Sequence, residues 1–96
     1  MKPITVAPRA RGDLREAWVY FRERWGLRRA NGYIRELDSV IQQVGDNPML
    51  GQACDDVRPG YRRHPAGSHM LFYEIRDDAV VIVRVLHQQM DVENKI

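Results

Sequence analysis

The stretch Val80-Val81-Ile82-Val83-Arg84-Val85-Leu86-His87 decides the fold of this chain. Six of its eight residues are aliphatic and most of those are β-branched, which predicts a β-strand over 80–87. Successive side chains of a strand point to opposite faces. The alternation predicts Val81, Val83, Val85 and His87 on one face, and Val80, Ile82, Arg84 and Leu86 on the other. Both faces are mainly apolar, as in a central strand that is covered on two sides.

Arg84 stands out within this strand. Burying a guanidinium without a partner is very costly, so Arg84 must reach a carboxylate, backbone carbonyls or water. Glu74, on the preceding predicted strand, is one such carboxylate. Two interpretations of Arg84 follow: an ion pair that supports the sheet, or a cation that serves the function.

The composition fits one domain that spans residues 1–96. No stretch resembles a signal peptide or an apolar run of about 18 residues, so we expect a cytoplasmic protein without membrane contact. Cys54 is the sole cysteine, which excludes an internal disulfide and fits a reducing compartment. The net charge is only +2, yet the basic residues are thirteen Arg and two Lys. Arginine favours recognition surfaces, although a GC-rich genome also enriches it.

The first half of the chain predicts a short strand and two helices. The strand lies within 1–6, and apolar residues then recur at helical spacing from Pro8 to Trp25, with Gly26 suited to end the helix. A second apolar stripe runs from Ala30 to Val44. Two helices joined by two or three residues form an antiparallel hairpin. Its expected core side chains are Trp18, Phe21, Tyr33 and Leu37.

The second half predicts an antiparallel meander. An irregular segment, 46–60, leads to strands over 61–65, 69–75 and 80–87, with polar turns between them. The element order is therefore β-α-α-β-β-β. This order indicates an α+β fold in which a helical hairpin packs on a small, mostly antiparallel sheet.

Short motifs follow one another in a distinctive order from about Ile4 to Asp91. They are Ala10 with Asp13-Leu14, Trp25-Gly26, Ala30 with Tyr33, Asn47-Pro48 with Gly51, Val57-Arg58-Pro59-Gly60-Tyr61-Arg62, Ser68-His69, Phe72-Tyr73, Val83-Arg84-Val85-Leu86-His87, and Met90-Asp91. Each motif alone is weak. The ordered set resembles the ParE toxins of the RelE/ParE superfamily of type II toxin–antitoxin systems, whose fold agrees with the element order above.

The resemblance implies a small toxin that inhibits growth, stabilises plasmids and needs no cofactor. A cognate antitoxin, ParD-like and of the ribbon-helix-helix class, would neutralise it. ParE-type members act on DNA gyrase, by trapping cleaved DNA or blocking supercoiling. RelE-type members share the fold but cut messenger RNA in the ribosome. A RelE-fold binding module without toxicity is a third alternative.

The residue types favour gyrase over RNA cleavage. RNA cleavage needs a base, cations for the phosphate and a donor for the leaving oxygen. If the chain is a ribonuclease, its candidate residues are Arg62, His64, Arg84 and His87. However, no Lys lies between Pro3 and Asn94 and no Tyr follows Tyr73, unlike RelE-type sites. We therefore assign no catalytic residue and expect an inhibitor of gyrase.

Two surfaces carry the expected interactions. The gyrase-binding candidates are Arg62, Arg84, His87, Met90 and Asp91. The antitoxin-binding candidates are Arg22, Arg24, Arg28 and Arg29, which would meet an acidic tail. The three histidines and Cys54 have no recognised metal-ligand spacing, so we expect no metal. A net charge of +2 also argues against strong direct binding of nucleic acid.

Overall fold

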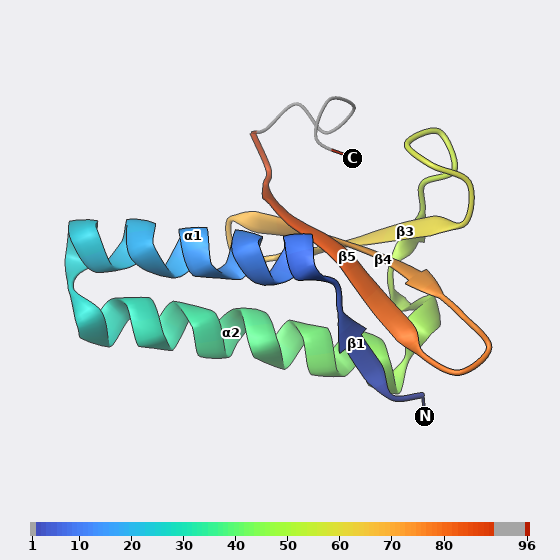
Figure 1. Cartoon of the computed structure of the whole chain (residues 1–96), viewed down its shortest axis with the longest axis horizontal. Coiled ribbons are helices and arrows are strands. Elements are labelled where there is room, and N and C mark those ends of the chain that lie inside the picture. The colour runs from blue at the N-terminus through green and yellow to red at the C-terminus, as the bar shows by residue number, and fades with distance from the viewer. Residues whose placement is uncertain (1, 90–95) are drawn as a thin grey trace.

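The computed structural model describes residues 2–89 and residue 96 (Figure 1). Met90 and Asp91, two of the gyrase-binding candidates, lie outside the described residues. The elements are β1 (Ile4–Val6), α1 (Pro8–Trp25), α2 (Leu27–Asp46), the 3-10 helix η1 (Pro48–Leu50), β2 (Gln52–Ala53), β3 (Tyr61–Ala66), β4 (His69–Ile75) and β5 (Val80–His87). The predicted α+β class and the order of the main elements are confirmed.

The two helices lie side by side and cover one face of a five-stranded sheet of order β1-β5-β4-β3-β2 (Figure 1). β1 runs parallel to β5, and the other neighbours are antiparallel. The pairing of β1 with β5 covers only Val80 to Ile82. β5 is therefore an interior strand in its first half only, and beyond Ile82 its outer edge faces α1.

The hairpin of α1 and α2 turns at a single residue. Gly26 follows the last residue of α1 and precedes the first residue of α2, with φ 89 and ψ 172. A side chain is strongly disfavoured in this backbone region, which explains glycine at the turn. The helical bounds of α1 match the prediction, whereas α2 begins at Leu27, so the predicted link of two or three residues was too long.

The segment between the hairpin and β3 contains two elements that the sequence pattern did not predict. η1 and the two-residue strand β2 lie within the predicted irregular segment, and β2 pairs with Arg62 and Arg63 of β3. Gln52 and Ala53 are both exposed, so β2 has no apolar alternation to reveal it. The sheet consequently has five strands, one more than the predicted element order contains.

A β-bulge interrupts the regular alternation of β5. Tyr73 pairs with Ile82 but Phe72 pairs with Arg84, so Val83 is an extra residue in β5. Two consecutive residues of the bulged strand therefore lie opposite one on its partner. Val85 joins the core beneath the helices together with Ile82, although the two are three residues apart. The strict alternation predicted for this strand is wrong beyond Val83.

The main core lies between the helices and the sheet. It includes Tyr33 and Leu37 of α2, Leu71 and Tyr73 of β4, and Val80, Ile82 and Val85 of β5. Phe21 is half-buried and stacks on Tyr33 with ring centroids 3.9 Å apart. Trp18 lies outside this core. Its indole Nε1 donates to Asn31 Oδ1 across the hairpin at 2.9 Å, so the expectation of a core Trp18 was wrong.

The other face of the sheet carries a smaller apolar cluster. Cys54, Phe72 and Leu86 are buried there, and Val57 and Ile96 are among the half-buried residues packed against them. Arg58 donates from Nη2 to the carbonyl of Ile96 at 2.9 Å. Burial on both faces, predicted from the two apolar sides of 80–87, is confirmed.

Candidate functional site

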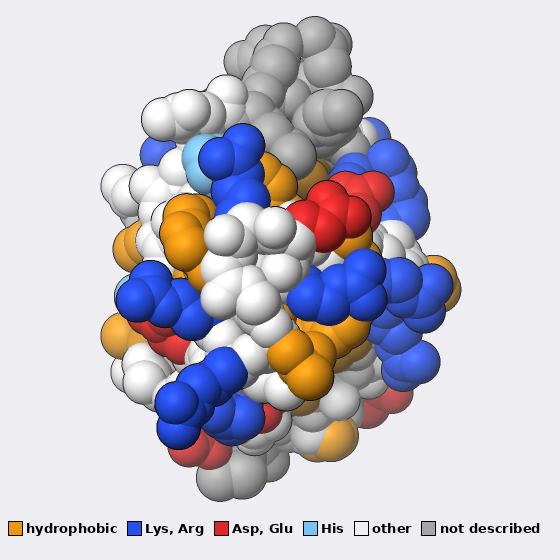
Figure 2. All heavy atoms as spheres, turned by 90° about the vertical axis from the view of Figure 1, so that its left-hand side faces the viewer, with side chains coloured by type: hydrophobic (Ala, Val, Ile, Leu, Met, Phe, Trp, Pro, Cys, Tyr) orange, Lys and Arg blue, Asp and Glu red, His pale blue; other side chains and the backbone are white. Residues whose placement is uncertain are grey.

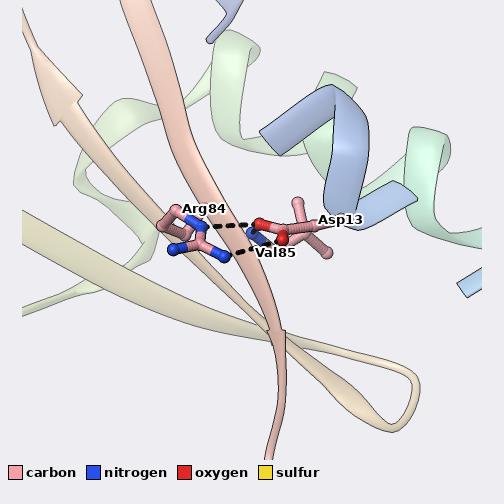
Figure 3. A network of polar contacts seen from close by, with 3 residues as sticks. All are labelled: Asp13, Arg84 and Val85. Carbon is pink, nitrogen blue, oxygen red and sulfur yellow. Dashed lines mark hydrogen bonds and ion pairs between the residues drawn. The ribbon is translucent and has the colours of Figure 1, made fainter. Parts of the chain in front are cut away.

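Asp13 connects α1 to the open edge of β5 (Figure 3). Asp13 lies in the apolar stripe of α1, between Ala10 and Ala17, and only 8% of its surface is exposed. Its Oδ2 accepts from Arg84 Nε at 2.8 Å and from the Val85 amide at 2.9 Å, and its Oδ1 accepts from Arg84 Nη2 at 2.8 Å. One carboxylate thus receives three donors from two consecutive residues.

The Asp13 carboxylate accepts the hydrogen bond that the Val85 amide would otherwise donate to a neighbouring strand. β1 ends at Val6, opposite Ile82, so no strand is available to accept the Val85 amide. A buried amide without an acceptor is costly, and Asp13 satisfies it. The bidentate geometry with Arg84 balances the charge of Asp13. The hydrogen bonds between Arg84 and Asp13 also raise the pKa of Arg84 above the usual range.

The partner of Arg84 differs from the carboxylate suggested by the sequence. Glu74 instead accepts from Arg76, in the turn that follows β4. Phe72 pairs with both Arg84 and Arg63, which places these two arginines on one face of the sheet. Arg84 therefore lies on the face of the sheet opposite to Arg62 and His64.

Tyr33 joins α2 to the turn between β3 and β4. Its hydroxyl accepts from the Ser68 amide at 2.9 Å and lies 2.6 Å from His69 Nδ1. Which of these two groups donates depends on the tautomer of His69. Burial lowers the pKa of His69, and the nearby His87 lowers it further. Burial also raises the pKa of Tyr33.

The turn itself fits closely against Tyr33. Gly67 has φ 57 in a two-residue hairpin loop, as a type II′ turn requires at its first central position. A Cβ on Gly67 would lie 2.8 Å from the Tyr33 ring. Glycine is therefore required here both by the backbone angle and by the space available.

A groove of about 460 Å³ lies between α1 and the adjoining ends of β4 and β5. Its lining residues are Asp13, Glu16, Ala17, Tyr20, Phe21, Trp25, Ser68, His69, Val85 and His87. The rings of His69 and His87 lie 5.5 Å apart at its sheet side. The groove is thus built of aromatic rings, neutral surfaces and two carboxylates, with no Lys or Arg in its lining.

The four ribonuclease candidates do not form one cluster. Arg62 pairs with Tyr73 on the helix-covered face and donates from Nε to the Gly51 carbonyl at 2.9 Å. His64 pairs with Leu71 two residues further along β3. Arg84 lies on the opposite face, and only His87 lines the groove.

Sequence reasoning missed the roles of Asp13 and Tyr33. The available signal was Asp13 itself, because it lies three residues after Ala10 and four before Ala17 on the buried side of α1. An acid in such a stripe requires a buried partner. Tyr33 offered no signal, since its ring fits a core position and its hydroxyl contacts a turn 35 residues away.

The antitoxin-binding candidates lie at the closed end of the helical hairpin. Arg22, Arg24, Arg28 and Arg29 are all exposed there. Figure 2 shows basic side chains around apolar ones on this end of the molecule. The guanidinium of Arg24 lies 4.7 Å from the Tyr20 ring centroid, and that of Arg22 lies 4.8 Å from Trp18. The exposed apolar residues of this end are Tyr20, Trp25 and Leu27.

Residues 2–89 and 96 contain neither a candidate metal site nor a candidate membrane span. In this part of the chain, no group of three or more His, Cys, Asp or Glu side chains is arranged to hold a metal ion. None of the helices in the same residues is both long enough and apolar enough to cross a membrane.

Comparison with known proteins identifies the family. A family model described as the ParE toxin of the type II toxin–antitoxin system parDE matches residues 4–92. The chain belongs to this family. Toxin ParE1 of Mycobacterium tuberculosis is 45% identical over 92 residues, which are 95% of this chain and 94% of that protein. Toxin ParE1 of Caulobacter vibrioides is 43% identical over 91 residues, with the same coverage of both chains.

The fold of this ParE-family toxin also matches a solved structure. The chromosomal ParDE system from P. aeruginosa contains a chain that superposes with a TM-score of 0.81 at 13% identity, covering 91% of this chain and 96% of that one. At this identity the match establishes the fold alone. The resemblance drawn from the ordered motifs is confirmed, and the chain is the toxin of a type II toxin–antitoxin system.

Proposed function

We propose that this ParE-family toxin arrests growth by acting on DNA gyrase and that a ParD-like, ribbon-helix-helix antitoxin neutralises it. Membership of the parDE toxin family and the two ParE1 relatives support a toxin that is paired with an antitoxin, and gyrase is the target that the resemblance to ParE-type members implies. The toxin would act in the cytoplasm, where gyrase works. It would stabilise a plasmid that encodes it, because cells that lose the antitoxin would be killed.

The observation that carries the proposal is the ion pair of Arg84 with Asp13. A ribonuclease needs cations free to stabilise the phosphate in the transition state. The side chain of Arg84 is 12% exposed, and its guanidinium makes two hydrogen bonds to one carboxylate. Directing it to a phosphate would leave Asp13 as a buried charge without its partner, which is strongly unfavourable.

Inhibition of gyrase makes no such demand on the site. A toxin that binds the cleaved-DNA state more tightly than the resting state shifts the enzyme toward the cleaved state without breaking a bond itself. The proposed contact residues are Arg62, Arg84 and His87, together with Met90 and Asp91 beyond the described part. Arg84 would contribute mainly by holding β5 in place, because little of its side chain is exposed.

The test uses purified toxin in two parallel reactions. One contains gyrase and supercoiled plasmid, and the other contains translating ribosomes with messenger RNA. We expect linear DNA or a loss of supercoiling in the first reaction and intact messenger in the second. Messenger cleavage that is abolished by His87→Ala, with gyrase unaffected, would instead establish the ribonuclease alternative.

A further inference from the structure

A second hollow, of about 370 Å³, lies beside the start of α1, on the side of the sheet that carries the smaller apolar cluster. Three guanidinium groups line it, those of Arg9, Arg58 and Arg84. Tyr61 and Val83 belong to the same lining, and both pack against the smaller apolar cluster. Among the described residues that line the hollow there is no Asp or Glu, so its walls are basic and apolar.

Hydrogen bonds hold two of the three arginines in place. Arg58 lies in the loop between β2 and β3, where its amide donates to the Cys54 carbonyl at 3.3 Å and its carbonyl accepts from the Tyr61 amide at 3.1 Å. Arg84 is fixed by its two hydrogen bonds to Asp13. Because these segments are already ordered, a ligand that enters the hollow loses little affinity to their ordering.

The third arginine, Arg9, lies in the first turn of α1. This helix begins at Pro8, its first turn contains no acidic residue, and no described side chain caps it. The start of a helix carries a partial positive charge, which favours anions. The start of α1 therefore adds to the attraction that the guanidiniums exert on an anion in the hollow.

The size and the chemistry of the hollow fit a phosphodiester. Arginine donates two parallel hydrogen bonds to a phosphate, and Arg9 and Arg58 add two guanidiniums to the one that Asp13 balances. The apolar wall of Tyr61 and Val83 suits the deoxyribose that flanks a phosphate. The carboxylate of an Asp or Glu side chain would fill only a small part of about 370 Å³.

We propose that this hollow holds one backbone phosphate of the DNA on which gyrase acts. Arg9 and Arg58 bind the phosphate, and Arg84 stays paired with Asp13 as a fixed wall. The proposal rests on the proposed function, to which it adds a contact with the DNA itself. Such a contact gives the toxin a higher affinity for DNA-bound gyrase than for free gyrase. A single phosphate contact is weak by itself, in agreement with the net charge of +2.

Three double variants separate charge, geometry and position. Arg9→Gln with Arg58→Gln removes both charges from the hollow, and Arg9→Lys with Arg58→Lys keeps the charges but removes the planar guanidiniums. Arg15→Gln with Arg35→Gln is the control, because these exposed arginines of α1 and α2 do not line the hollow. A melting temperature within a few degrees of the parent shows that each variant is folded.

The first measurement is the Kd of the full-length toxin for gyrase alone and for gyrase bound to a DNA duplex, at several salt concentrations. The Gln pair should weaken binding to gyrase with DNA about tenfold relative to the control pair, and the Lys pair should weaken it less. The slope of log Kd against log salt should fall by about one in the Gln pair. Binding to gyrase without DNA should be equal in all variants.

The second measurement needs no gyrase. A short DNA duplex is added to the parent toxin at low salt, and the side-chain Nε–H signals of the arginines are followed by NMR. The signals of Arg9 and Arg58 should shift together, and the signal of Arg15 should stay in place.

Other results would overturn the proposal in distinguishable ways. Full affinity of the Gln pair for gyrase with DNA would exclude the hollow as a contact. Equal losses with and without DNA would identify a carboxylate of gyrase as the ligand and exclude the phosphate. Arg9 and Arg58 signals that do not move with DNA would also exclude a phosphate site. Shifts of both signals in a toxin that does not bind gyrase would support the phosphate site and refute the proposed function.

Discussion

Asp13 is the residue on which α1 and β5 both depend. Its carboxylate accepts from the Arg84 guanidinium and the Val85 amide, and all three groups are buried or nearly so. Removing one member of such a group leaves the others without partners, which costs more than the net value of the pair. The cost of replacing Asp13 is therefore set mainly by the Arg84 guanidinium and the Val85 amide, which lose their acceptor.

Asp13→Ala should lower the free energy of unfolding by about 3 kcal/mol, measured by urea denaturation. Glu16→Ala, one turn along the same helix and exposed, should change it by less than about 0.5 kcal/mol. In the double variant Asp13→Leu with Arg84→Met, much of the loss should be recovered because no buried charge remains. A loss below about 1 kcal/mol for Asp13→Ala would show that Arg84 finds another partner.

His69 should make the fold less stable in weak acid. Its pKa is lowered from 6.5 in the folded state, mainly by burial, so the unfolded chain takes up this proton more readily. The contribution of His69 is fully present above pH 6.5 and decreases as the pH falls from there toward the folded pKa. The melting temperature of the parent should fall more between pH 7.5 and 5.5 than that of His69→Asn. Parallel pH curves for the two proteins would contradict this account.

At the scale of elements, the single-residue turn between the helices sets their relative direction. Gly26→Ala should destabilise the fold by about 2 kcal/mol, because φ 89 with ψ 172 is accessible almost only to glycine. Gly12 provides the control. It lies in α1, and an added Cβ there meets nothing within 4 Å, so Gly12→Ala should stabilise by about 0.5–1 kcal/mol. Two-state urea unfolding of both variants tests the difference in sign.

The contacts between α1 and α2 are unequal in their contribution to the core. Leu37→Ala should cost about 3–5 kcal/mol because this side chain is fully buried. Trp18→Ala should cost about 1–2 kcal/mol, since its ring is half-buried and its main polar contact is with Asn31. Equal losses in the two variants would mean that the Trp18 ring is as important to the core as Leu37.

For the whole molecule, the closed end of the hairpin is remote from the N-terminus (Figure 1), and Arg28 and Arg29 lie at this end, in the first turn of α2. Arg28→Glu combined with Arg29→Glu should slow association with an acidic antitoxin segment by about tenfold at low salt, and added salt should reduce the difference. Lys2→Glu at the opposite end should have little effect. Stopped-flow association rates at two ionic strengths distinguish electrostatic attraction of the antitoxin from a change in the stability of the toxin. Equal slowing by both changes would exclude a local role for the hairpin arginines.

The sequence predicted those parts of the molecule that follow from local periodicity. The bounds of α1, β4 and β5 agree because strong helical or alternating patterns and clear turns surround them. β2 was missed because its two residues are ordered by pairing with β3 alone. The bulge at Val83 was missed because either register of a strand that is apolar on both faces looks much the same in sequence. The groove could not be predicted, since it forms where a helix and two strands meet.

The bulge has a consequence for the ion pair. If β5 kept all its residues but ran regularly, Val83 would pair with Phe72, and the Val85 amide would face β4 instead of Asp13. The Arg84 side chain would move to the other surface of the sheet at the same time. Every amino acid that forms the ion pair would still be present in such a strand, yet the pair would be lost. A variant that lacks Val83, the extra residue, would by contrast keep the later residues of β5 in their present register.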